Sequence, residues 1–403
     1  MGFVDPSTAL ITSFIFLAIL IYKRVNLGIT LTSTAMLLAL LSAEWQRIPT
    51  VIFETTVNPL TMSLVIATFG IMLLSQLYKE TKVIDALSES ISRIVKNSKL
   101  VVSTLPAIIG LLPVAGGALM SAPLVEAETE KLGLKAEKKT YVNVWFRHTI
   151  FPVYPVSQVL ILIEKLTELA LISILLRQIP VVILMVIVGY LIGLWKTPKK
   201  AVKKENLRIS VGSELKRFIV TFSPILATII AVVGFGVDVA VSAFIGVAVL
   251  LVIARPSLQV FTKPLKNWAI YGITLAAYGA FLMRNVVEEI GIAEIFGPFV
   301  ANGNVDALFL LLVIPAVLSF FIGSPLGGIA ISFSILSGVL NFTPKSAALL
   351  YISAYLGYVI APTHLCLILT AEYFKCPLGK LYKYLIPSLA VSILTAILVY
   401  ILA

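Results

Sequence analysis

The sequence contains little charge and few reactive side chains. Only 13% of its 403 residues are charged, and it has two histidines and two cysteines. With 59% hydrophobic residues and a mean hydropathy of +1.03, a chain of this length cannot be a soluble domain. Cys366 and Cys376 lie ten residues apart near one predicted helix, a spacing that suits neither a disulfide framework nor a metal site. We therefore interpret both as small buried apolar residues.

Common catalytic and nucleotide-binding signatures are also missing. The sequence has no Walker loop, no HExxH, no dinucleotide glycine fingerprint and no aspartate-rich diphosphate site. We therefore predict that the protein is not an enzyme and has no bound cofactor. No acidic pair occurs at the predicted membrane midplane, which weakens a cation/proton antiporter of the two-aspartate kind. A cleavable signal is not expected, because Asp5 rather than a basic region precedes the first apolar run.

Long apolar runs are what the sequence does contain. A helix needs roughly 20 apolar residues to cross a bilayer, and we predict ten such spans and two hairpins of shorter segments. In the first half we expect spans at 7–22, 27–43, 58–78, 139–163 and 169–195, an interfacial helix at 79–98 and a hairpin at 99–125. In the second half we expect spans at 218–236, 239–254, 268–283, 345–374 and 379–402, an interfacial stretch at 284–304 and a hairpin at 305–343.

The two halves share one order of elements. At a fixed offset of 211 residues, Met72 pairs with Met283, Gly116 and Gly117 with Gly327 and Gly328, and Ser121 with Ser332. Each half holds five spans and one re-entrant hairpin, and an odd number of crossings inverts the second copy. The predicted fold is thus an all-α polytopic membrane protein of two inverted repeats, which is typical of carriers. Its predicted parts are a scaffold (1–98) and a transport part (99–195), a linker (196–217), and a second scaffold (218–304) and transport part (305–403).

The charges indicate an orientation in the membrane. Cytoplasmic loops carry an excess of Lys and Arg, and the loops that we assign to the inside sum to +15 while those outside sum to −6. Arg147 and Arg177, which we place within the membrane, complete the net charge of +11. We expect a plasma-membrane protein of a prokaryote with both termini outside and residues 196–217 in the cytoplasm. The positive charge then contacts anionic lipid head groups, and no nucleic-acid partner is expected.

Four interruptions of apolar segments predict the ligand site. Two are the hairpin tips Pro113–Gly117 and Gly323–Gly328, and two are breaks in long helices at Phe151–Pro155 and Ala361–Thr363. Backbone that leaves helical geometry within the membrane exposes polar groups, which cost several kcal/mol each unless protein, water or a ligand satisfies them. Glycine amides and helix N-termini at the tips favour an anion. The alternative is that the glycines only permit close helix packing.

Arg147 and His148 are the most distinctive polar residues of the predicted membrane region. A charged residue near mid-bilayer costs at least about 2.5 kcal/mol and is a candidate functional residue. A guanidinium binds carboxylate or oxyanions at two points, so we predict Arg147 as the anchor of an anionic solute. It could instead reach the cytoplasmic interface or pair with Glu126. The predicted substrate-binding residues are Asn143, Arg147, His148, Gly116, Gly117, Ser121, Tyr154, Ser324, Gly327, Gly328, Thr363 and His364.

The order of elements resembles a known superfamily. Three spans, a surface helix, a hairpin, a proline-broken helix and a closing span, duplicated and inverted, are similar to the ion-transporter superfamily that includes the divalent anion/sodium symporters. With the segments Gly323–Gly328 and Ala361–Cys366, the chain looks closest to a ten-span prokaryotic family catalogued as domain of unknown function 401. The resemblance implies a homodimeric elevator carrier. The symporters have Ser-Asn-Thr at both hairpin tips, which this chain lacks. The resemblance therefore does not extend to a dicarboxylate substrate or to sodium coupling.

We therefore expect a secondary active transporter of a small anion, coupled to Na⁺ or H⁺. A Na⁺ site is predicted near the breaks, at Ala115, Gly116, Pro152, Gly323, Ser324 and Ala361. The alternatives are a cation/proton exchanger that uses His148 or His364 for proton transfer, and a channel.

Overall fold

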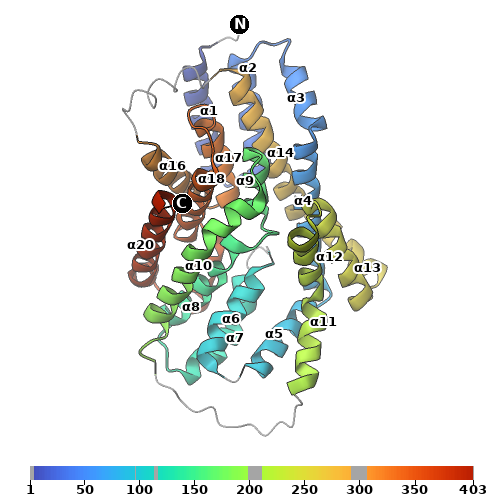
Figure 1. Ribbon diagram of the computed structural model, residues 1–403, viewed down its shortest axis with the longest axis vertical. Coiled ribbons are helices and arrows are strands. Elements are labelled where there is room, and N and C mark those ends of the chain that lie inside the picture. The colour runs from blue at the N-terminus through green and yellow to red at the C-terminus, as the bar shows by residue number, and fades with distance from the viewer. Residues whose placement is uncertain (1–3, 96, 113–116, 198–210, 292–305, 403) are drawn as a thin grey trace. The chain divides into compact units, whose positions relative to one another are not determined.

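The computed structural model describes residues 4–95, 97–112, 117–197, 211–291 and 306–402. Over these residues the secondary structure is helical, with no strand (Figure 1). By length and composition, six of the described helices can cross a membrane. They are α4 (Pro59–Glu80), α8 with α9 (Ala136–Thr167), α10 (Leu171–Gly193), α11 with its π-helical end (Val211–Gly234), α14 (Trp268–Glu289) and α20 (Leu378–Leu402). The prediction of an all-α polytopic membrane protein is confirmed at this level.

Shorter helices occupy most of the remaining predicted segments. They are α1 (Pro6–Tyr22), α2 (Leu27–Ser42), α5 (Val83–Ile94), α6 (Ser98–Gly110), α7 (Ala118–Lys131), α12 (Val239–Ala254), α16 (Ala307–Ile322), α17 (Pro325–Leu336), α18 (Pro344–Val359) and α19 (Leu365–Tyr373). Within the long segments, α8 ends at Thr149 and α9 (Gln158–Thr167) follows the 3-10 turn η1 (Phe151–Val153). The π-helical end of α11 is η2 (Ile230–Gly234), and α11 proper is Val211–Ile229.

Two short helical segments were not predicted from the sequence. Helix α3 (Ile48–Val57) lies in what we expected to be an external loop, and α13 (Leu258–Thr262) with η3 (Pro264–Lys266) lies in a predicted internal loop. Helix α3 has only ten residues, too few for a membrane span. One face of it buries Ile48 and Val51, but its polar residues obscure this apolar pattern in the sequence. The hairpin tip at 113–116 and most of the stretch 284–304 lie outside the described residues.

The chain divides into two compact units, and each takes segments from both halves of the sequence. Unit 1 consists of Met1–Phe69, Gln158–Ile174 and Asn267–Tyr358. Unit 2 consists of Gly70–Ser157, Leu175–Lys266 and Val359–Ala403. The division into scaffold and transport parts stays a prediction.

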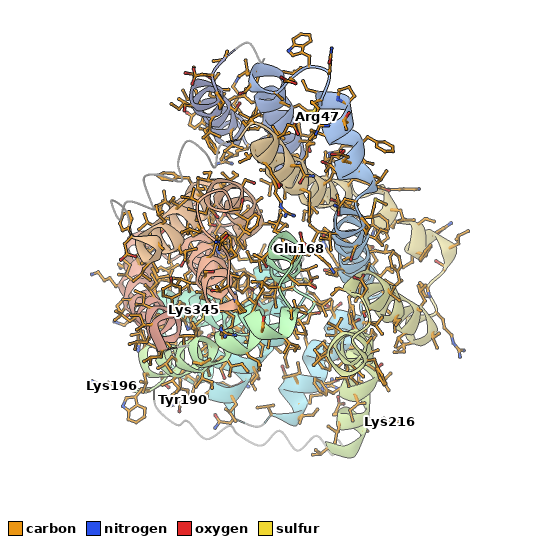
Figure 2. All side chains as sticks on the ribbon, turned by 45° about the horizontal axis from the view of Figure 1, so that its top comes forward. Arg47, Glu168, Tyr190, Lys196, Lys216 and Lys345 are labelled. Atoms are coloured by element: carbon orange, nitrogen blue, oxygen red, sulfur yellow. The ribbon has the colours of Figure 1, made fainter. Side chains whose placement is uncertain are left out.

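In unit 1, helices α2 and α14 approach backbone to backbone. A Cβ atom on Gly28 would collide with the carbonyl of Gly272, and one on Gly279 would lie 2.9 Å from Leu31 Cβ. At the C-terminal end of α14, Arg47 (labelled in Figure 2) donates from Nε and Nη2 to the two carboxylate oxygens of Glu289, at 2.9 and 3.1 Å. The pairing ties the loop before α3 to the end of α14.

In unit 2, helix α8 is buried among α6, α7, α10, α19 and α20. Trp145 is fully buried and its indole N–H donates to the carbonyl of Met185 on α10 at 2.9 Å. On the α20 side, the Tyr141 hydroxyl lies 2.6 Å from Ser388 Oγ. These contacts fix the rotation of α8 and thereby determine where its polar residues point.

Candidate functional site

Helix α8 brings three polar residues into the interior of unit 2. Asn143, Arg147 and His148 are 0%, 5% and 6% exposed. The helix ends at Thr149, three residues before Pro152, because a proline lacks the N–H that a helix interior requires and disfavours helical geometry just before it. Arg147 and His148 therefore occupy the last turn of α8, next to the predicted break.

Arg147 is buried, and the part of the chain that the structure describes gives it no charged partner. Its Nη2 donates to the carbonyl of Leu112, just beyond α6, over a long 3.4 Å, and its Nη1 has no hydrogen-bond partner among the described residues. Among the described residues no carboxylate forms an ion pair with it. The predicted alternative, a pair with Glu126, does not occur, because Glu126 accepts from the Tyr373 hydroxyl at 2.8 Å. A second alternative was that Arg147 extends to the interface, and its burial argues against this.

The position of Arg147 depends on Gly110. A Cβ atom at residue 110 would collide with the carbonyl of Arg147 and crowd its side chain. The last turn of α6 and the last turn of α8 are thus in backbone contact, which brings the carbonyl of Leu112 within reach of the guanidinium.

Asn143 joins three helices one turn before Arg147. Its Oδ1 accepts from Ser121 on α7 at 2.7 Å. Its Nδ2 donates to the carbonyl of Ala118 at 3.0 Å and to Thr370 Oγ1 on α19 at 3.3 Å. The network satisfies the amide, so Asn143 and Ser121 hold the site together in this structure. The sequence analysis did not single out Thr370.

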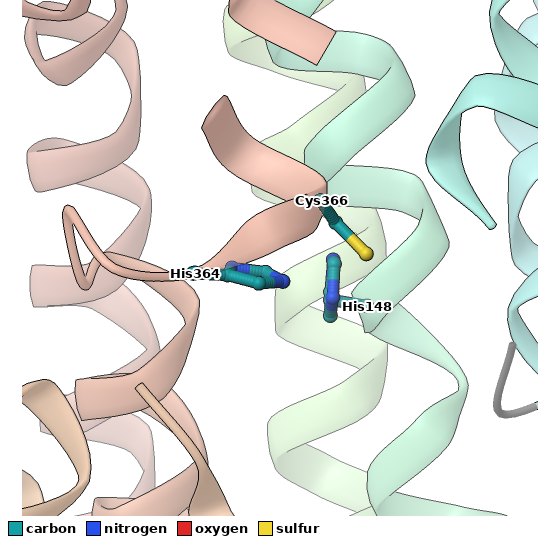
Figure 3. A group of neighbouring side chains, drawn as sticks. All are labelled: His148, His364 and Cys366. Atoms are coloured by element: carbon teal, nitrogen blue, oxygen red, sulfur yellow. The ribbon is translucent and has the colours of Figure 1, made fainter. Parts of the chain in front are cut away.

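His148, His364 and Cys366 form a buried cluster (Figure 3). One ligand atom from each, a ring nitrogen or the sulfur, lies within 4.8 Å of the other two. The imidazole rings meet edge to face, with centroids 4.7 Å apart at 84°. Cys366 is hydrogen-bonded to the His148 side chain. His364 and Cys366 come from the start of α19, which lies beside the end of α8.

Backbone carbonyls orient both rings. His148 Nδ1 lies 2.6 Å from the carbonyl oxygen of Val144, and His364 Nδ1 lies 3.2 Å from that of Val359. A carbonyl can only accept, so in each neutral imidazole Nδ1 carries the proton and Nε2 carries the lone pair. In both rings the backbone carbonyl therefore fixes the tautomer, with the lone pair on Nε2.

The remaining predicted residues of unit 2 lie around the breaks. Tyr154 and Pro152 are buried beside η1, Ala361 is buried, and Thr363 is exposed in the turn between α18 and α19. Gly117 precedes the first turn of α7. Ala115 and Gly116 lie outside the described residues.

The residues predicted at the second hairpin tip belong to unit 1. Ser324 is the N-cap of α17, its Oγ accepting from the Gly327 amide at 3.5 Å and its carbonyl from the Gly328 amide at 3.1 Å. A Cβ atom on Gly328 would collide with Ser319 Oγ of α16. Gly323 adopts a φ of +70° and ends α16, a conformation that glycine allows at low cost. Close packing therefore accounts for Gly328, while the predicted ligand contacts of this tip stay predictions.

Sequence reasoning missed that Cys366 lies beside the two histidines. From the sequence we interpreted both cysteines as small buried apolar residues. Both are buried and neither forms a disulfide. The available signal was that Cys366 follows His364 by two residues. Without the fold, nothing placed His148 near them. Arg147 is also close enough to act electrostatically on His364 and Cys366.

Comparison with known proteins gives a family without an assigned activity. The model of the family described as "Protein of unknown function (DUF401)" matches residues 6–403. No curated protein matches the chain.

Proposed function

The chain belongs to the DUF401 family, whose function is unknown, and from its buried arginine we propose that it is a secondary active transporter of a small anionic solute. The solute class is a carboxylate or an inorganic oxyanion. Coupling to Na⁺ or H⁺ and an elevator-type movement are part of the proposal.

The observation that carries the proposal is the uncompensated charge of Arg147. Transferring an ion out of water costs several kcal/mol even after relaxation, and a guanidinium does not lose its proton to avoid this cost. Its Nη1 has no hydrogen-bond partner and no described carboxylate pairs with it. A bound anion would supply both the missing charge and the missing acceptor, in the two-point geometry that guanidinium favours.

The surrounding backbone supports a ligand at this place. Helix α8 stops at Thr149 and α18 stops at Val359, and their continuations α9 and α19 begin only after segments that are not α-helical. Non-helical backbone within a membrane protein is kept where it lines a cavity or is buried in protein. In carriers, such discontinuous helices form the substrate site.

The element order supports the carrier architecture. Helices α2, α4, α6, α7, α8, α9 and α10 recur in the same order as α12, α14, α16, α17, α18, α19 and α20. We propose that the two sets are inverted repeats, that α6 with α7 and α16 with α17 are re-entrant hairpins, and that the protein works as a homodimer in a prokaryotic plasma membrane.

The test uses purified protein in proteoliposomes and the variant Arg147→Met, with Arg93→Ala as the control because the Arg93 side chain is 45% exposed in its ion pair with Glu214. Small carboxylates and oxyanions are screened by thermal shift with and without Na⁺, and each stabilising anion is then assayed for uptake and counterflow. A ligand at 100 times its dissociation constant stabilises by about 2.7 kcal/mol. We expect Arg147→Met to abolish both the shift and saturable uptake, and Arg93→Ala to retain them.

The melting temperature of the ligand-free protein distinguishes a binding role from a structural one. Removing an uncompensated buried charge should leave stability unchanged or raise it. A clear fall in stability together with normal anion uptake would show that Arg147 is structural and would refute the anchor assignment.

A further inference from the structure

The strongest unassigned feature is the cluster of His148, His364 and Cys366. Two imidazoles and a thiol, contributed by α8 and by the segment that begins α19, place their ligand atoms within 4.8 Å of one another in the interior of unit 2. We propose that the three side chains form a binding site for monovalent copper, with the Nε2 atoms of both histidines and the sulfur of Cys366 as ligands. This proposal does not depend on anion transport.

The donor chemistry selects a soft transition metal. Thiolate ligands favour Cu⁺ and Zn²⁺ over hard cations such as Na⁺, Mg²⁺ and Ca²⁺, and imidazole suits the same soft and borderline ions. The three ligand atoms would need to contract only modestly, because metal–nitrogen and metal–sulfur bonds of roughly 2.0–2.3 Å place ligands of one ion closer together than 4.8 Å.

The hydrogen bonds behind the ligands are those of a metal site. Metal-bound histidines nearly always donate the other ring N–H to a carbonyl, carboxylate or water, which fixes the tautomer and the ring orientation. Here the carbonyls of Val144 and Val359 accept from Nδ1 of His148 and His364. The proton of each ring is thus on the Nδ1 side, and an ion bound at Nε2 of His148 would take the place of the Cys366 thiol proton that is hydrogen-bonded to this ring. Figure 3 shows the two rings and the thiol converging.

Charge and burial favour Cu⁺ over Zn²⁺. The cluster residues are between 0% and 8% exposed, and Arg147 acts electrostatically on His364 and Cys366. Cu⁺ with one thiolate and two neutral imidazoles is electrically neutral, whereas Zn²⁺ with the same ligands would leave a net positive charge beside a buried guanidinium. Three ligands also complete the trigonal coordination that Cu⁺ accepts, while Zn²⁺ requires a fourth ligand. On binding, the Cys366 thiol releases its proton to the medium, and no electron transfer is involved.

The experiment is a Cu⁺ titration of the purified full chain in detergent, without oxygen and with ascorbate as reductant, in competition with a chromogenic Cu⁺ chelator. We expect one Cu⁺ per chain in the wild type. Cys366→Ser should lower the affinity at least 100-fold, and His148→Gln and His364→Gln should each lower it 10-fold or more. Cys376→Ser is the matched control, because Cys376 is the other buried cysteine and should leave binding unchanged.

X-ray absorption at the copper edge identifies the ligands in the wild-type protein itself. It therefore tests the proposal even if a variant fails to fold. The wild type should show one sulfur and two nitrogen neighbours. A shell without sulfur, Cu⁺ binding that persists in folded Cys366→Ser, or no Cu⁺ binding by the folded wild type would each overturn the site. A parallel Zn²⁺ titration that saturates at one ion per chain while Cu⁺ does not bind would overturn the choice of metal.

Discussion

Two buried cationic residues inside unit 2, Lys99 and Arg147, differ in how completely their side chains are hydrogen-bonded. Lys99 is only 8% exposed, yet its Nζ donates to the carbonyls of Leu194 and Thr197 at 3.0 and 2.9 Å. These carbonyls follow the last turn of α10, where a cation is favoured by the helix dipole. Arg147 differs, because its Nη1 lacks a partner among the described atoms. The contacts of Lys99 thus indicate a role in stability, and ligand binding by Arg147 is our proposal.

The variant Lys99→Met should therefore destabilise the protein. It removes two charge-assisted hydrogen bonds to buried carbonyls, at a cost of about 2–4 kcal/mol. The matched control is Lys131→Met, since the Lys131–Glu128 pair is partly exposed at 44% and 16% and should contribute less than about 1 kcal/mol. Melting temperatures in detergent by intrinsic fluorescence would measure both. Equal melting temperatures for the two variants would contradict the role of Lys99.

At the scale of helices, glycines on α10 set its distance from α8. A Cβ atom on Gly189 would lie 2.6 Å from Trp145 Cδ1, and one on Gly193 would lie 2.9 Å from Val142 Cγ1. Small residues spaced by four are typical of close helix packing in membranes. This contact also fixes α8, which carries Arg147 and His148. Packing outside the cluster of His148, His364 and Cys366 therefore helps to determine the geometry of that cluster.

We predict that Gly189→Ala lowers stability by about 1–3 kcal/mol, the usual cost of overpacking. Gly379→Ala is the control, because a Cβ atom there would meet nothing within 4 Å and alanine favours the helix by about 1 kcal/mol. Thermal unfolding of the two variants should shift in opposite directions. A Gly189→Ala protein as stable as the wild type would mean that α8 and α10 are less closely packed than described.

At the scale of the whole molecule, neither half of the chain forms a unit by itself. In unit 1, α2 from the first half packs on α14 from the second. In unit 2, Arg93 of α5 pairs with Glu214 of α11 at 3.0 Å, and Arg217 pairs with Glu89 at 3.1 Å. Each unit therefore needs segments from both halves of the chain to be complete.

The proposed inversion of the repeats predicts opposite exposure of the ends of the two hairpins. Lys131, at the end of α7, should face the cytoplasm, and Asn341, after α17, should face the outside; both are exposed. In a chain lacking the native cysteines, a membrane-impermeant maleimide should label Asn341→Cys in intact cells. It should label Lys131→Cys only after permeabilisation. Labelling of both in intact cells would refute the inverted arrangement and the carrier proposal with it.

The sequence by itself determined the membrane class, the positions of most helices and the breaks at Phe151–Pro155 and Ala361–Thr363. These features depend on local properties, namely runs of apolar residues and the geometry of proline and glycine. It failed at α3, where a short helix carries polar residues.

Only the tertiary structure decided which polar residues meet. It paired Arg47 with Glu289, satisfied Asn143 with Ser121 and Thr370, and placed no carboxylate of the described residues in an ion pair with Arg147. It also placed Cys366 against two histidines from separate segments. Such contacts depend on how helices distant in sequence pack together, and hydropathy and spacing within one segment carry no information about that packing.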